Sequence, residues 1–96
     1  MTIRTSVGLT FSYAVIGVPQ SQEQKFGVRE CDVTIEERRV GKTRKLFVTL
    51  HNEIDGLKEF NQVWLTHDGQ VYEGVGRMAG PSQLLIELYH DQPDFA

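Results

Sequence analysis

The chain has 96 residues, of which 40% are hydrophobic and 24% charged, and its formal net charge is −3. This size predicts one domain over residues 1–96, and the apolar fraction is too high for a disordered chain. No apolar run approaches the roughly 20 residues of a membrane-spanning helix, and the first residues lack a signal-peptide pattern. A Rossmann or P-loop domain needs more βαβ units than a chain of this length can form. We therefore expect a small globular domain with no membrane partner.

The first predicted strand covers residues 7–16. Large apolar residues alternate there with small ones, at Val7, Leu9, Phe11, Tyr13 and Val15. Successive side chains of a strand point to opposite faces, so the large ones would line the core. We expect the strand to end before Pro19, which has no backbone N–H for a ladder.

A second strand is predicted over residues 26–39. Val28 lies in the even register, whereas Val33 and Ile35 lie in the odd one, and a change of register inside one strand indicates a β-bulge. The single cysteine, Cys31, shares the odd register and is expected to be a buried, unreactive thiol. A lone cysteine forms no internal disulfide, which favours a cytoplasmic setting.

The third predicted strand covers residues 45–51, with Leu46, Val48 and Leu50 inward and a turn near residues 40–43. The segment after it is ambiguous. Residues 53–60 can form a short helix, since Asn52 could cap it and Ile54, Leu57 and Phe60 follow a three-residue spacing. The Asp55-Gly56 pair could equally form a turn.

The clearest element is a hairpin of residues 62–66 and 70–75. Its turn sequence, His67-Asp68-Gly69-Gln70, is typical of a type I′ turn, because Asp and Gly tolerate the positive φ that it needs. A two-residue loop pairs Thr66 with Val71, Leu65 with Tyr72 and Trp64 with Glu73. Leu65 and Tyr72 then share a face, with Trp64 on the other.

Two glycine motifs resemble nucleotide-binding sequences, and we interpret both structurally. Gly41-Lys42-Thr43 lacks the earlier glycine of a P-loop and lies between strands. The stretch 74–79, Gly-Val-Gly-Arg-Met-Ala, fits a dinucleotide-binding pattern, but we expect too little room after it for that motif's second strand and the acidic residue that binds ribose about 20 residues further on. We expect Gly74 and Gly76 to permit a bend or a close backbone approach.

Residues 82–90 fit either a strand or a helix, and we favour the strand. The fold prediction is therefore mainly β: a single barrel or sandwich of five to six mostly antiparallel strands, with the alternative of an α+β fold with a helix at 82–90. Residues 91–96 are expected to be a frayed tail. The predicted core includes Phe11, Val33, Ile35, Val48, Leu50 and Leu65.

Charge is distributed unevenly along the chain. Residues 1–45 carry eight Lys/Arg and five Asp/Glu, whereas residues 46–96 carry two and eight. Half of the basic residues lie within residues 38–45: Arg38, Arg39, Lys42, Arg44 and Lys45. Glu36 and Glu37 would pair with some of them. All five basic residues form the predicted partner-binding site on an exposed hairpin.

These features favour a non-enzymatic adaptor, inhibitor or regulatory subunit that binds another protein through complementary charge. Self-association as a homodimer or ring is a second form of the same hypothesis, because basic and acidic parts occur in one chain. An alternative is an RNA- or single-stranded-DNA-binding barrel, in which Trp64 or Tyr72 would stack on a base. A small-ligand binder or enzyme subunit with an unmarked pocket is a third hypothesis. No catalytic residues, metal ligands or cofactors are predicted.

Overall fold

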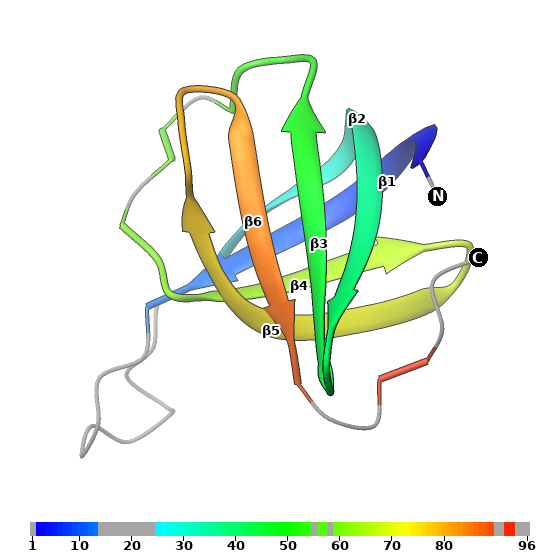
Figure 1. Ribbon diagram of the computed structural model, residues 1–96. Coiled ribbons are helices and arrows are strands. Elements are labelled where there is room, and N and C mark those ends of the chain that lie inside the picture. Colours follow the sequence, from blue (N-terminus) through cyan, green and yellow to red (C-terminus); the bar gives the residue numbers. More distant parts are fainter. Residues whose placement is uncertain (1, 14–24, 55, 58, 90–91, 94–96) are drawn as a thin grey trace.

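The computed structural model describes residues 2–13, 25–54, 56–57, 59–89 and 92–93. They form six strands: β1 (Thr2–Ser12), β2 (Lys25–Val40), β3 (Thr43–Leu50), β4 (Gln62–His67), β5 (Gln70–Met78) and β6 (Gln83–Leu88). Antiparallel pairing closes them into a barrel in the order β1-β2-β3-β6-β5-β4 (Figure 1). The predicted mainly-β fold is confirmed, with a closed barrel as its form.

Strand β2 is long enough to pair with two neighbouring strands. Its residues up to Glu36 pair with β1, and its residues from Val33 onward pair with β3. The register with β1 shifts where Val7 faces Cys31 but Leu9 faces Val28, so Arg29 and Glu30 of β2 lie opposite the single residue Gly8 of β1. This is the predicted β-bulge, which adds local twist to the strand.

The core fills the barrel interior. All six predicted core residues are buried, and Cys31 is buried with them. The Phe11 ring stacks on that of Phe26 at 5.3 Å between centroids and meets that of Phe60 at 4.7 Å. The inward placement of Tyr13 was wrong: β1 ends at Ser12, and the Tyr13 side chain is 45% exposed. The expected continuation through residue 16 lies outside the described residues.

The β4–β5 hairpin has the predicted turn. Asp68 and Gly69 both have positive φ, at 49° and 77°, as a type I′ turn requires. The three predicted cross-strand pairs are also present. Leu65 and Tyr72 point into the core.

The predicted close approach at the two glycines is confirmed. A Cβ on Gly74 would overlap the Glu87 carbonyl oxygen, and one on Gly76 would overlap the Val63 side chain. Both glycines lie within strand β5 and so do not form a nucleotide-binding loop.

Two helix expectations are corrected by the structure. The described residues between 51 and 61 form no helix, and Gly56 has a φ of 71° that a right-handed helix excludes. Ile54, Leu57 and Phe60 instead pack on the core from an irregular segment. The helix alternative for residues 82–90 is also wrong, because β6 is hydrogen-bonded between β3 and β5. No helix in the described part of the chain is long and apolar enough to cross a membrane.

Candidate functional site

The basic hairpin joins β2 to β3 through a turn at residues 41–42, where Gly41 has a φ of 63°. The strand period of two divides its basic side chains between the faces of the barrel wall. Arg38 and Lys45 share the outer face, and Arg39 and Arg44 share the register of the buried residues. Lys42 lies in the turn. The five side chains therefore do not form one continuous surface.

Arg44 closes one end of the barrel. Its Nε donates to Glu37 Oε1 at 2.9 Å, and both side chains are only 14% exposed. Its Nη1 and Nη2 donate to the carbonyl oxygens of Gln92 and Pro93 at 2.7 and 2.9 Å. The expectation that Arg44 lies on an exposed surface is therefore wrong. Its side chain is nearly buried, and two of its three hydrogen bonds hold the hairpin to the C-terminal segment.

Gln92 adds a second link at this end of the barrel. Its Oε1 accepts a hydrogen bond from the Glu73 backbone N–H at 3.0 Å. Gln92 and Pro93 are thus anchored to the barrel at both the hairpin and β5. The remainder of the predicted frayed tail, 91 and 94–96, lies outside the described residues.

Arg38 and Arg39 are exposed, and nearby carboxylates partly compensate their charges. Arg38 donates to both carboxylate oxygens of Glu36, at 3.0 and 3.2 Å, and its guanidinium lies 4.5 Å from the Phe47 ring centroid. The hydrogen bonds from Arg38 lower the pKa of Glu36. Arg39 Nε lies 3.9 Å from Glu37 Oε1. The expected pairing of the hairpin with Glu36 and Glu37 is confirmed.

The end of the hairpin projects beyond the barrel wall. Pairing of β3 with β6 stops at Lys45 and Glu87, so residues 38–44 continue as a two-stranded ribbon. Val40 is 69% exposed there, more than the other exposed large apolar residues of the described chain. We call Arg38, Arg39, Val40 and Lys42 the hairpin tip. It combines one exposed apolar side chain with three cationic side chains.

The two aromatic residues proposed for base stacking lie in different environments. Tyr72 is 3% exposed within the core, so its ring has no free face for a base. Trp64 lies on the outer face of β4, and the Lys25 ammonium sits 4.9 Å from its ring centroid. Around the closed barrel β4 is three strands from β3 in either direction. Trp64 therefore lies on a strand that is adjacent to neither strand of the basic hairpin.

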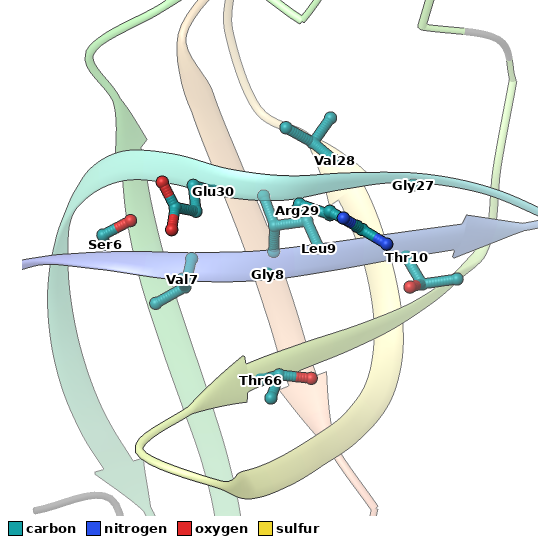
Figure 2. A pocket seen from close by; sticks show the side chains of 10 residues that line it. All are labelled: Ser6, Val7, Gly8, Leu9, Thr10, Gly27, Val28, Arg29, Glu30 and Thr66. Atoms are coloured by element: carbon teal, nitrogen blue, oxygen red, sulfur yellow. The ribbon is translucent and has the colours of Figure 1, made fainter.

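A groove on the outer face of β1 and β2 was missed by the sequence analysis. It has a volume of about 650 Å³ and follows the bulge, with Gly8 and Gly27 in its lining (Figure 2). A Cβ on Gly27 would lie 3.0 Å from the Leu9 carbonyl oxygen, a tighter contact than a Cβ atom usually makes, so glycine suits the close approach of the two backbones there. Arg29 lies toward the Thr10 end of the groove (Figure 2). Two outward glycines beside a predicted bulge are the sequence signal that could have indicated it.

The described residues contain no group of three or more His, Cys, Asp and Glu side chains placed to hold a metal ion. Burial raises the pKa of the Cys31 thiol, and the neighbouring Asp32 raises it further, so this thiol is a poor nucleophile. Comparison with protein-family models, with curated proteins and with solved structures gives no match for this chain.

Proposed function

We propose that this barrel is a non-enzymatic protein-binding module whose hairpin tip docks on an acidic, partly apolar segment of another protein. The observation that carries the proposal is Val40, 69% exposed at the end of a projecting ribbon and flanked by arginines and Lys42. Burial of an exposed valine on a partner would add an apolar contact. The surrounding cations would steer acidic partners toward it.

The arrangement of aromatic residues favours protein over nucleic acid as the partner. Single-stranded nucleic acid is held by cationic grooves combined with aromatic rings on which bases stack. Tyr72 is buried, and Trp64 lies on a strand that is not adjacent to the hairpin. The net charge of −3 also differs from the basic character that such domains usually have.

The proposal is tested with a double variant of the hairpin tip, Val40→Ser with Lys42→Glu. The probe is a fluorescent peptide of alternating glutamate and valine, titrated at about 20 and 150 mM salt, and the matched control is Val71→Ser with Arg29→Glu. Both variants replace one exposed valine and one cationic residue, so they change the net charge equally. We expect the tip variant to weaken binding at least tenfold at low salt and the control to retain it.

Three results would reject the proposal. They are no peptide binding by the unmodified protein, equal binding by the tip variant, and tighter binding of a mixed single-stranded oligonucleotide than of the peptide. A steep loss of oligonucleotide affinity with salt would indicate phosphate contacts and support the nucleic-acid alternative.

A further inference from the structure

We infer that two copies of this chain associate through the outer face of β3 and β6, about a twofold axis that follows the seam between these strands. This inference concerns a surface that shares only Arg38 with the hairpin tip, and it does not depend on the acidic partner proposed above. It comes from the order of outward side chains across four neighbouring strands, β2, β3, β6 and β5. Strands β3 and β6 lie side by side in Figure 1.

Two rows of side chains cross the seam on this face. Cα pairing places the first row in the order Arg38, Lys45, Glu87, Val75. The second row follows the order Glu36, Phe47, Leu85, Arg77. All eight residues have the register opposite to that of the buried residues on their strands.

The second row is self-complementary about its centre, and so is the central Lys45–Glu87 pair of the first row. When two such faces pack around a twofold axis along the seam, each side chain meets the residue at the same distance on the other side of the seam. Lys45 of one copy then faces Glu87 of the other. Phe47 faces Leu85 in the same way, and both are partly exposed.

The flanking strands continue this pattern. Glu36 of one copy would face Arg77 of the other, and each such contact occurs twice in the dimer. A third row adds Thr49 opposite Gln83, two polar residues that already share a 2.8 Å hydrogen bond within the chain. Arg38 would face Val75, with its guanidinium still held by Glu36 and Phe47.

The shape of the barrel sets the strength of this contact. A closed barrel presents a convex wall, so the two seam strands touch first and the flanking strands curve away. Only long side chains such as Glu36 and Arg77 bridge the wider gap. Small contacts of this kind form weak or transient complexes. We therefore expect a dimer with a dissociation constant of about 10–500 μM at low salt, since exposed charge pairs are screened as salt rises.

A charge exchange across the seam tests the inference. The variants are Lys45→Glu, Glu87→Lys, and the two combined, and the measurement is sedimentation equilibrium between about 5 μM and 1 mM protein at 20 mM salt. Each single change creates two like-charge contacts in a twofold dimer, and we expect it to raise the dissociation constant at least tenfold. The combined variant restores opposite charges and should return to within about threefold of the unmodified protein.

Three controls separate the loss of dimerisation from other effects of the variants. Like charges on directly paired residues also destabilise a single chain, so thermal unfolding is measured at one dilute concentration for every variant. Glu30→Lys makes the same charge change as Glu87→Lys, but on an exposed residue of the bulge, and it should leave dimerisation unaltered. The hairpin-tip variant Val40→Ser with Lys42→Glu should also dimerise normally, even where it no longer binds the acidic peptide.

Four outcomes would overturn the inference: a protein that is monomeric at 1 mM, single variants that dimerise as the unmodified protein does, a folded combined variant that does not recover, and a tip variant that is impaired as strongly as the single variants. The last outcome would place the contact at the hairpin tip. If the tip variant loses peptide binding but still dimerises, the result bears only on the function proposed for the hairpin tip and leaves the dimer inference standing.

Discussion

Substitution of Gly74 by alanine should destabilise the barrel strongly, because β5 and β6 approach each other too closely there for a Cβ atom. Gly74 is paired with Leu88 of β6 and with Val63 of β4. An added Cβ would overlap the Glu87 carbonyl oxygen and lie 2.8 Å from its carbonyl carbon, where ordinary contact begins at 3.4 Å. The obstacle is backbone, which cannot rotate away as a side chain can. The added methyl group must therefore displace β6.

The magnitude follows from the cost of overpacking a tight interior, typically about 1–3 kcal/mol and occasionally more. Movement of β6 also weakens its ladders with β3 and β5, so we expect a loss of about 3 kcal/mol in the free energy of unfolding. For a domain of this size that is a fall of roughly 12–24 °C in Tm.

The matched control is Gly80→Ala, whose Cβ would meet only the Gln83 Cβ, at 3.9 Å. It should change the free energy of unfolding by less than about 0.5 kcal/mol, or stabilise slightly by restricting the unfolded chain. Both variants are measured by urea unfolding, followed by far-ultraviolet circular dichroism. Equal stabilities for the two variants would show that the approach of β5 and β6 does not require glycine.

Three other predictions concern single groups. Arg44→Met leaves the nearly buried Glu37 carboxylate without its donor and should cost about 2–4 kcal/mol in urea unfolding, and Glu37→Gln in the same chain should recover part of the loss. The Cys31 thiol should react with a disulfide reagent at least a hundredfold more slowly in the native protein than in urea, because its burial keeps the reagent away and also raises its pKa. Equal rates would contradict its burial. The Arg4 guanidinium holds the pKa of Asp32 below its ordinary value, so the unfolded chain takes up that proton first and stability falls as pH drops through the folded pKa. Arg4→Gln should make this acid limb of the pH–stability curve shallower, and an unchanged limb would show that the pair makes no contribution.

Most of the fold could be predicted because each strand buries one face. Alternation of large and small residues over 7–11 and inward residues at 46, 48 and 50 directly reflect the barrel wall. The bulge could be predicted from the sequence for the same reason, since apolar residues must change register where an extra residue is inserted. The hairpin turn was readable because few residues accept positive φ at two successive positions.

The segment 51–61 shows where periodicity fails. Its apolar residues recur every three positions, as they would on a helix, but Gly56 has positive φ and these apolar residues pack on the core from an irregular segment. A loop that covers a core also needs apolar side chains at intervals, with no regular backbone hydrogen bonds. Spacing alone does not separate these two causes in so short a run.

The candidate surfaces were less predictable than the fold. The basic hairpin was visible as a local concentration of charge. The seam between β3 and β6 joins residues about 40 positions apart, and their register depends on the closure of the barrel. The groove at the bulge likewise needs Gly8 and Gly27 on neighbouring strands. Local sequence patterns carry no information on such pairings.

Register nevertheless assigns the hairpin residues their separate roles, and it determines which variants can test them. Glu37 has the odd register of buried Ile35, and Arg44 the even register of buried Leu46, so both point toward the barrel interior although they lie among charged residues. A combined reversal of Arg38, Arg39 and Arg44 to glutamate would place two new carboxylates near Glu37 and remove the donor to Gln92 and Pro93. It should therefore unfold or loosen the barrel through Arg44, whatever the hairpin binds. A test of binding must change only the tip or only the seam.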